Sequence, residues 1–253
     1  MKMYWNLASF LIEKLQASGT MYATLIYAGC VLLCMVVSYL LGSLNFGVIL
    51  SHAKYKGDIR EHGSGNAGTT NMLRTYGKGA AAATMVGDML KAVVAIGLGY
   101  ILLPSLARGE EGNLIKLMYG PAIASLFVVL GHMFPCFFKF KGGKGVACAL
   151  IVVLMTDPLV LLIVLIVWLA VVLATRYVSL GAIMSMIVYP IFLSTVEKVF
   201  YGAVSAASGT AVILAVLIIF MHRENIKRLR AGTESKLTFK KKKAEDAADS
   251  EEQ

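Results

Sequence analysis

Long apolar stretches separated by short charged loops run through most of the chain. Stretches without any Asp, Glu, Lys or Arg occur at 15–53, 117–138, 158–175, 177–196 and 199–222. A helix needs about 20 apolar residues to cross the hydrocarbon core of a bilayer, which is roughly 30 Å thick. Each stretch therefore predicts one membrane-spanning helix, and the first is long enough to hold its span at about 27–50.

A further apolar segment, 79–103, carries two charges. Asp88 and Lys91 are three positions apart, so on a helix they lie on one face. Charges inside a membrane are costly unless they pair or face the interior of a helix bundle. We therefore expect another spanning helix whose inner face holds Asp88 and Lys91 as structural support.

The segment 145–156 is ambiguous. Its 12 residues make about 18 Å of helix, which is short for a span. It fits a short crossing helix, a re-entrant hairpin, or half of a longer helix through Asp157 and Pro158. Lys and Arg gather on the cytoplasmic side of membrane proteins. If the segment crosses, 18 of the 24 Lys and Arg lie on one side; otherwise the basic C-terminal tail lies opposite the basic loops. The sequence therefore predicts an all-α integral membrane protein with seven transmembrane helices, the N-terminus outside and the C-terminus cytoplasmic.

The composition agrees with a membrane protein and limits the explanations of the positive net charge. Hydrophobic residues make up 58% and charged residues 15% of the chain, and the mean hydropathy is +0.73. Soluble domains contain about 45–50% hydrophobic residues and about 25% charged residues. A soluble globular protein is excluded, and so is a nucleic-acid binder that spreads the net charge of +9 over a water-facing surface. The four Cys lie in or beside apolar stretches without zinc-type spacing, which predicts buried apolar side chains.

The two ends of the chain differ from the part between them. Residues 1–26 carry bulky apolar side chains and few charges, which predicts a short interfacial segment rather than a cleaved signal peptide. The tail at 236–253 runs from lysines into acidic residues and is expected to be a disordered, solvated cytoplasmic segment. The membrane domain is predicted at 27–235.

Three polar loops fall on the predicted cytoplasmic side and share one kind of composition. They read GDIREHGSGNAGTTNMLRTYGKG at 57–79, FKFKGGKGVA at 138–147 and HRENIKRLRAGTES at 222–235. Glycine allows successive backbone N–H groups to converge on an anion, and Lys or Arg adds positive charge. The three loops together therefore indicate a site for phosphate or carboxylate groups.

Several familiar catalytic motifs are missing or misplaced. The glycines at 63, 65 and 68 match the spacing of a dinucleotide-binding loop, but they follow a membrane helix rather than a strand. The sequence contains no GxxxxGK[ST], no GxSxG and no His followed five residues later by Asp. His222 and Asn225 are three apart, which predicts one shared helix face at the cytoplasmic end of the last span. The His is suited to act as a base and the Asn to hold a hydroxyl.

With these loops in view, the chain resembles the bacterial acyl-phosphate:glycerol-3-phosphate acyltransferase family of the PlsY type. The resemblance extends over about 39–234. It rests on YLLGSLNFG at 39–47, GSGNAGTTNMLR at 63–74, GDMLKA at 87–92, GHMFPCFFKFKGGKGVA at 131–147, RYVSL at 176–180 and HRENIKRLRAGTES at 222–235. It implies transfer of a fatty acyl group from acyl phosphate to the 1-hydroxyl of glycerol 3-phosphate in a bacterial inner membrane, with the active site facing the cytoplasm. It implies no metal and no cofactor, and a partner enzyme that makes acyl phosphate.

The resemblance also assigns roles to individual residues of this chain. His222 and Asn225 match the essential pair near the glycerol, and Glu234 matches a supporting glutamate. Substrate phosphate is expected at Ser64, Arg74, Lys144, Gly142, Gly143 and Gly145. Beyond the resemblance, we expect Asn66, Thr70 and Asn71 to contact the acyl phosphate or to support the residues that do. Two other interpretations stay open: a transporter with Asp88 and Lys91 along its path, and a structural protein that binds anionic lipid headgroups.

Overall fold

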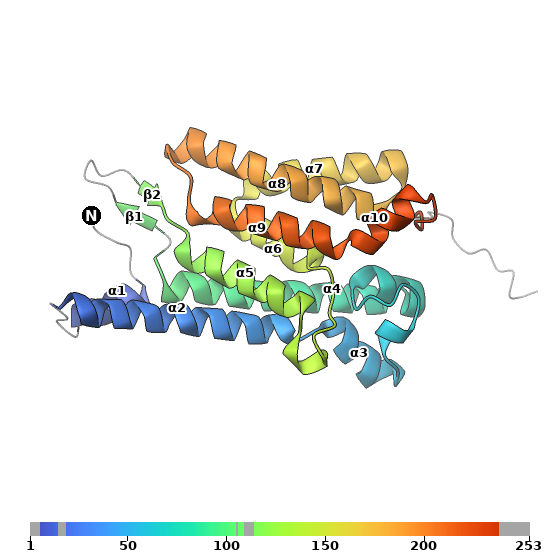
Figure 1. Ribbon diagram of the computed structural model, residues 1–253, viewed down its shortest axis with the longest axis horizontal. Helices are drawn as coiled ribbons and strands as arrows, with labels where there is room; N and C mark the ends of the chain where they lie inside the picture. Colours follow the sequence, from blue (N-terminus) through green and yellow to red (C-terminus); the bar gives the residue numbers. More distant parts are fainter. Residues whose placement is uncertain (1–5, 15–18, 105, 109–113, 238–253) are drawn as a thin grey trace, which may run out of the picture.

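The computed structural model describes residues 6–14, 19–104, 106–108 and 114–237 as a bundle of helices aligned along one long axis (Figure 1). The helices are α1 (Leu7–Lys14), α2 (Thr20–Ser43), α3 (Phe46–Tyr55), α4 (Thr69–Leu102), α5 (Tyr119–Met133), α6 (Val146–Thr156), α7 (Pro158–Thr175), α8 (Val178–Tyr201), α9 (Ala206–Met221) and α10 (Arg223–Arg230). Two 3-10 turns, η1 (Ile59–Glu61) and η2 (Cys136–Phe138), and two strands, β1 (Leu106–Arg108) and β2 (Leu114–Lys116), complete the described elements.

Successive long helices run in alternate directions along the bundle (Figure 1). The segments α1 and β1–β2 lie at one end, whereas α3, the start of α4 and α10 lie at the other. The strands form an antiparallel hairpin that pairs Leu106 with Lys116, in a connection where the sequence predicts no strand. The alternation brings the loop after α3, the loop before α6 and the segment after α9 toward one end of the molecule.

The lengths of the helices confirm a membrane protein but qualify the number of spans. Five described segments are long and apolar enough to cross: Met21–Tyr55, Thr69–Leu102, Tyr119–Phe138, Pro158–Thr175 and Val178–Tyr201. A sixth qualifies if α9 and α10, bent by 56° to each other, count as one span. The predicted seventh, at 145–156, is a separate helix of 11 residues, α6, about 17 Å long. Asp157 ends it and caps α7, because the Asp157 carboxylate accepts hydrogen bonds from the N–H groups of Leu159 and Val160 at 3.0 and 3.3 Å.

The first span is broken where the sequence predicted a continuous helix, and the helix of the second begins before its predicted start at 79. The helix α2 begins at Thr20, before the predicted domain start at 27, and it ends at Ser43, inside the predicted span of 27–50. Asn45 then caps α3, since its Oδ1 accepts a hydrogen bond from the N–H of Val48 at 3.2 Å. In α4, Gly77 has φ +83° and separates the first two turns from the long membrane helix. The short helical pieces set apart by these breaks, α3 and the first two turns of α4, stand on either side of the polar loop at 57–68 in the sequence.

The predictions for the two ends of the chain are only partly within the described residues. The helix α1 packs on the start of α2 and buries Ala8, but residues 1–5 and 15–18 lie outside the described part. The interfacial role of 1–26 stays a prediction. Of the predicted tail at 236–253, residues 238–253 also lie outside the described part.

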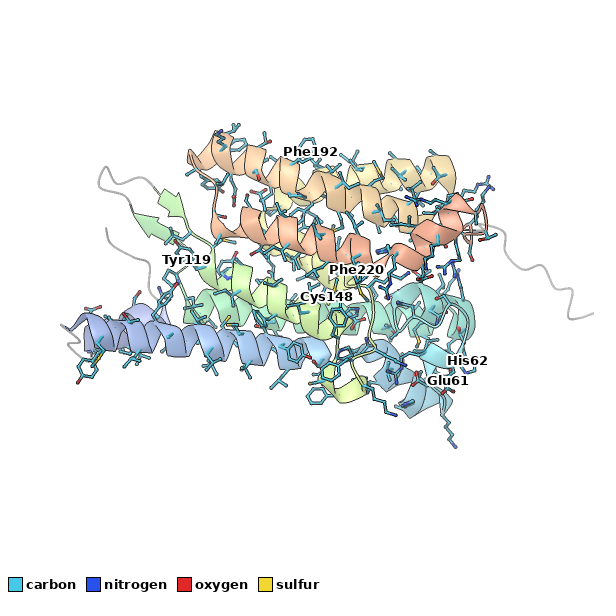
Figure 2. All side chains as sticks on the ribbon, viewed as in Figure 1. Glu61, His62, Tyr119, Cys148, Phe192 and Phe220 are labelled. Carbon is cyan, nitrogen blue, oxygen red and sulfur yellow. The ribbon has the colours of Figure 1, made fainter. Side chains whose placement is uncertain are left out.

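Glycine allows the helices to pack closely. A Cβ on Gly42 of α2 would lie 2.2 Å from the carbonyl oxygen of Val128, and one on Gly131 of α5 would lie 2.2 Å from that of Tyr39. Small residues at such crossings are typical of helix pairs in membranes, where close contact stabilises the pair. On the outside, large apolar side chains such as Phe192 and Phe220 point away from the bundle (Figure 2). This is the arrangement expected for a surface in contact with lipid.

Candidate active site

One cavity of about 380 Å³ brings the three polar loops together. Its polar part is lined by the loop before α4, the first turns of α4, the start of α6, and the segment from His222 to Ser235. Its apolar part lies among α4, α6, α7 and α8. Three of the apolar lining side chains, Met85, Val146 and Leu165, are between 37% and 41% exposed on the outer surface of the bundle. The cavity therefore joins a polar end to a side opening on the lipid-facing surface.

The first loop is built around the side chain of Asn71. Its Nδ2 donates to the carbonyls of Ile59, His62 and Asn66 at 2.9–3.0 Å, and its Oδ1 accepts the N–H of Ser64 at 2.9 Å. Asn71 is 2% exposed, and its amide is fully used inside the loop. Asn71 therefore shapes the loop, and its contact with acyl phosphate stays a prediction.

The same loop leaves other predicted residues free to face the cavity. Asn66 caps the turn before α4, because its Oδ1 accepts the N–H of Gly68 at 3.1 Å. Ser64, Thr70 and Arg74 are exposed and line the cavity. The helix begins at Thr69. The N–H groups of Asn71 and Met72 donate to the carbonyl of Gly68, whereas those of Thr69 and Thr70 precede the first helical hydrogen bond and favour an anion. Figure 2 shows Glu61 and His62 of this loop at the end of the molecule formed by α3 and the start of α4.

The second loop holds three glycines for three different reasons. A Cβ on Gly142 would lie 2.1 Å from the carbonyl oxygen of His132, and one on Gly143 would lie 2.2 Å from Nε2 of the same residue. Gly145 has φ +85° and caps α6, a conformation that side-chain-bearing residues rarely adopt. Lys144 stands among them and lines the cavity. Only Gly145 of the three lines the cavity directly.

Lys144 reaches the third loop. Its Nζ donates to Oδ1 of Asn225. Burial lowers the pKa of Lys144 to about 8; the carboxylate of Glu234 opposes this shift, while the charges of Arg228 and Arg74 add to it. A nearby anion favours the charged form of a lysine whose pKa burial has lowered. Lys144 is thus charged at neutral pH and gains from a bound phosphate.

His222 and Asn225 lie at the bend between α9 and α10 rather than on one continuous helix. His222 ends α9 and is 3% exposed. Its Nδ1 lies 2.8 Å from the carbonyl oxygen of Ile218, which can only accept. Nδ1 therefore carries the proton in the neutral ring, and Nε2 keeps a lone pair. Both residues line the cavity, as predicted.

Glu234 connects Asn225 of α10 to α8. It accepts hydrogen bonds from Nδ2 of Asn225 at 2.6 Å, Oγ of Ser179 at 2.8 Å and Nε of Arg228 at 2.7 Å. Burial disfavours the charged form, but the hydrogen bonds from Asn225, Arg228 and Ser179 outweigh it and lower the pKa of Glu234. The carboxylate is thus ionised at neutral pH and fixes the position of Asn225.

The comparisons with known proteins agree with this geometry. Residues 32–232 match the family model described as glycerol-3-phosphate acyltransferase. The glycerol-3-phosphate acyltransferase of Rhizobium etli is 43% identical over 206 residues, which cover 81% of this chain and 90% of that protein. That of Carboxydothermus hydrogenoformans is 39% identical over 211 residues, covering 83% and 98%. The crystal structure of PlsY (YgiH), an integral membrane glycerol 3-phosphate acyltransferase in its glycerol 3-phosphate form, has a TM-score of 0.72 and 36% identity, covering 82% of this chain and 96% of PlsY. A second PlsY structure, in the lysophosphatidic acid form, has a TM-score of 0.69.

The chain belongs to the glycerol-3-phosphate acyltransferase family. It is an acyltransferase and an integral membrane protein, as the resemblance predicted. The cavity of this acyltransferase brings together most of the residues that the sequence singled out. Those that line it are Ser64, Asn66, Thr70, Asn71, Arg74, Asp88, Lys144, Gly145, His222, Asn225 and Glu234, whereas Gly142, Gly143 and Lys91 do not.

The two charges of α4 lie buried on one helix face, as the sequence predicted, and they pair with each other. Nζ of Lys91 lies 2.8 Å from Oδ1 of Asp88, and both side chains are at most 2% exposed. The contact is an ion pair rather than an aligned hydrogen bond, because neither Asp88 oxygen has hydrogen-bond geometry to a described partner. Lys91 instead donates to the carbonyls of Gly42 and Leu44 at 2.9 and 2.7 Å. Lys91, paired with Asp88, therefore stabilises the C-terminal end of α2.

Sequence reasoning missed residues that bind the loops to one another. The guanidinium of Arg60 forms an ion pair with the Asp58 carboxylate, with Nη2–Oδ2 at 2.6 Å. Its Nη1 donates to the carbonyls of Phe138 and Lys141 at 2.8 and 3.0 Å. It thereby ties the first loop to the second. Ser179 and Arg228, which hold Glu234, were also unassigned. Ser179 and Arg228 stand inside the motifs that carry the resemblance, but only the fold shows their partners.

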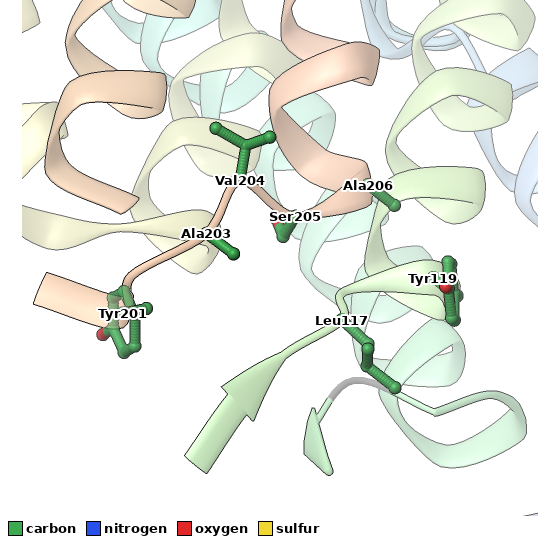
Figure 3. A pocket seen from close by; sticks show the side chains of 7 residues that line it. All are labelled: Leu117, Tyr119, Tyr201, Ala203, Val204, Ser205 and Ala206. Atoms are coloured by element: carbon green, nitrogen blue, oxygen red, sulfur yellow. The ribbon is translucent and has the colours of Figure 1, made fainter. Parts of the chain in front are cut away.

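A second, smaller cavity of about 100 Å³ lies at the opposite end of the acyltransferase, between the start of α5 and the α8–α9 connection (Figure 3). Tyr119 and Tyr201 flank it, and 203–206 form one wall. Its lining residues include no carboxylate, imidazole or cation. Among the described residues, no group of three or more His, Cys, Asp and Glu could hold a metal ion.

Proposed function

We propose that this acyltransferase moves a fatty acyl group from acyl phosphate to the sn-1 hydroxyl of glycerol 3-phosphate. The products are 1-acylglycerol 3-phosphate and inorganic phosphate, as in the first step of phospholipid synthesis. The observation that carries the proposal is the continuous cavity, with Lys144, Arg74 and His222 at its polar end and an apolar side opening at the other. Such a cavity fits one small phosphorylated substrate and one that combines a phosphate with a fatty chain.

The phosphates are assigned to the two glycine-rich loops. Lys144, Arg74 and Ser64 bind the phosphate of glycerol 3-phosphate, beside the free N–H groups at the start of α6. Thr70 and the N–H groups at the start of α4 receive the acyl phosphate. Holding two anions at once requires fixed positive charge, which the two loops supply.

The reaction needs positioning and one proton acceptor. The hydroxyl oxygen of glycerol 3-phosphate bonds to the acyl carbon, and the bond from that carbon to the phosphate oxygen breaks, so that phosphate leaves with the electron pair. Nε2 of His222 takes the hydroxyl proton, because its lone pair is free while Nδ1–H donates to Ile218. The ring pairs with a backbone carbonyl rather than with Ser or Cys, so no covalent acyl-enzyme is required.

The membrane arrangement follows from the same interpretation. We place all seven helices α2 and α4–α9 across a bacterial inner membrane, with the N-terminus outside and the site facing the cytoplasm. The alternating directions of the helices support this orientation, and so do the 18 Lys and Arg that fall on one side of the topology predicted from the sequence. The short α6 is then enclosed by neighbouring helices, where a reduced length is tolerated. An enzyme that makes acyl phosphate is the partner that this donor requires.

One assay tests the donor, the acceptor and the product together. Purified protein in detergent receives palmitoyl phosphate and glycerol 3-phosphate, and lysophosphatidate and phosphate are measured as they form. We expect equal amounts of both products, and none when palmitoyl-CoA replaces palmitoyl phosphate. Because detergent leaves no sealed compartment, product formation also excludes transport as the main activity. Turnover with palmitoyl-CoA alone would overturn the assignment of the donor.

A further inference from the structure

His132 lies between the buried charge pair and the second glycine loop. It belongs to the last turn of α5 and is 2% exposed. Its Nδ1 lies 3.0 Å from Nζ of Lys91 and 3.4 Å from Oδ1 of Asp88. Both of these residues come from α4, and the thiol of Cys148 in α6 is a further titratable group that acts on the ring. The ring is therefore fixed on one edge by an ion pair in a part of the protein where charges are costly.

The opposite edge of the ring supports the loop. A Cβ on Gly143 would meet three atoms of His132, namely Nε2 at 2.2 Å, Cε1 at 2.9 Å and Cδ2 at 3.1 Å. The N–H of Gly143 also donates to the carbonyl of His132 at 3.0 Å. Gly143 is not among the glycines with positive φ. The need for glycine at 143 therefore comes from the imidazole ring and not from the backbone conformation.

Gly142 provides a contrast one residue earlier. A Cβ there would lie 2.1 Å from the carbonyl oxygen of His132, 2.6 Å from Cδ of Pro135 and 2.9 Å from the carbonyl oxygen of Met133. The nearest of these is a backbone atom of His132, which no substitution of its side chain removes. Glycine is therefore required at 143 because of a side-chain ring that mutation can remove, and at 142 mainly because of the backbone of His132.

We propose that His132 is a positioning residue for the loop that carries Lys144. Asp88 and Lys91 fix the ring, the ring fixes the position of Gly143, and the loop then presents Lys144 to the phosphate of glycerol 3-phosphate. The inference rests on the proposed function for the last of these steps. Its steric part, the contact between the ring and Gly143, does not.

The test is a pair of double-mutant cycles. His132→Asn keeps a donor and an acceptor near the position of Nδ1 but removes the ring atoms that reach Gly143. We compare Gly143→Ala, His132→Asn and the double variant, with Gly142→Ala as the matched control. Each purified protein is assayed for kcat and for KM toward both substrates, and its Tm is measured.

We expect Gly143→Ala alone to raise KM for glycerol 3-phosphate about tenfold or more, with KM for acyl phosphate nearly unchanged. In the His132→Asn background the same substitution should raise it less than about threefold, because the obstructing ring is gone. Gly142→Ala should be equally harmful in both backgrounds. If Gly143→Ala raises KM by the same factor with the His132 ring present and in the His132→Asn background, the proposal is overturned.

The Tm separates this proposal from the proposed function. If the wild-type protein does not use acyl phosphate, the proposed function fails, yet the Tm loss caused by Gly143→Ala should still shrink in the His132→Asn background. If activity is as proposed but Tm and KM show no coupling between 132 and 143, the positioning role fails alone. A loss of KM coupling with Tm coupling intact would also refute it, because the contact would then be purely structural.

Discussion

Glu234 shows at the scale of one residue how the site is kept in order. It binds side chains from two helices, Ser179 of α8 and both Asn225 and Arg228 of α10, and Asn225 in turn accepts from Lys144. A carboxylate with two oxygens is needed, because all three partners donate to it. The negative charge also offsets part of the positive charge that gathers around the cavity.

Glu234→Gln should therefore impair catalysis through geometry rather than through substrate contact. Gln replaces one acceptor by an NH2 group, which faces a donor. Losing one charge-assisted hydrogen bond costs about 2 kcal/mol, so we expect kcat/KM to fall roughly 30-fold. Steady-state kinetics on the purified variant measures this. Glu224→Gln, whose side chain is 57% exposed and pairs with Lys227, is the control and should retain full activity. Equal activity of the two variants would refute the role of Glu234.

The charge of Lys144 makes a second prediction at this scale. Its pKa of about 8 means that the free enzyme loses this charge as the pH rises through 8. Glycerol 3-phosphate binds the charged form, so its KM should be constant below about pH 7.5 and rise by up to about tenfold per pH unit above 8.5. Lys144→Arg stays charged throughout, so its KM should not rise in this range. A wild-type KM that stays flat up to about pH 9.5 would contradict the assignment of Lys144.

At the scale of elements, Arg60 joins two loops that are far apart in the sequence. It donates to the carbonyls of Phe138 and Lys141, on either side of Lys139 and Phe140, which both have φ +57°. Left-handed backbone at residues other than glycine costs on the order of 1 kcal/mol or more for each residue. The guanidinium, which Asp58 orients, therefore stabilises a strained turn next to the loop of Lys144.

Arg60→Lys should loosen this connection. A Lys ammonium cannot make two parallel hydrogen bonds to the Asp58 carboxylate and also donate to both carbonyls. We expect KM for glycerol 3-phosphate to rise about five- to tenfold and Tm to fall by a few degrees, because roughly 1–2 kcal/mol of hydrogen bonding is lost. Arg223→Lys, at a site with a 52% exposed side chain, is the matched control. Unchanged KM and Tm in Arg60→Lys would show that the two loops are positioned independently.

These elements also show which features a sequence can predict. The shared inner face of Asp88 and Lys91 was predictable, because their spacing puts them on one side of a helix and charge is costly on the lipid side. The shortness of α6 was visible as a 12-residue gap between charges. The partners of Asn71 and Arg60 were not predictable, because they depend on loop conformation and on contacts 78 residues apart for Arg60 and Phe138. The bend at His222 was hidden for the same reason: nothing in the local pattern interrupts a helix there.

At the scale of the whole molecule, the short α6 decides the topology. If it crosses, the loop containing Glu61 and the segment containing Glu224 face the same side; if it does not, they face opposite sides. Both residues are exposed, and Ala203 is exposed at the other end of the bundle.

Cysteine labelling measures this directly. In a background without the four native Cys, single variants Glu61→Cys, Glu224→Cys and Ala203→Cys are treated with a membrane-impermeant maleimide in intact cells. We expect label at 203 only, and label at 61 and 224 after the membrane is opened. Label at 61 or 224 in intact cells would contradict seven crossings with a cytoplasmic site.

The central claim for the whole molecule is that the cavity at His222 carries out acyl transfer. Its most direct test is His222→Ala, with kcat for palmitoyl phosphate and the dissociation constant of glycerol 3-phosphate measured on the same purified protein. We predict that kcat falls about 10²–10⁴-fold, the usual contribution of a general base, while glycerol 3-phosphate binds within about threefold of wild type. Full turnover in His222→Ala would contradict this claim.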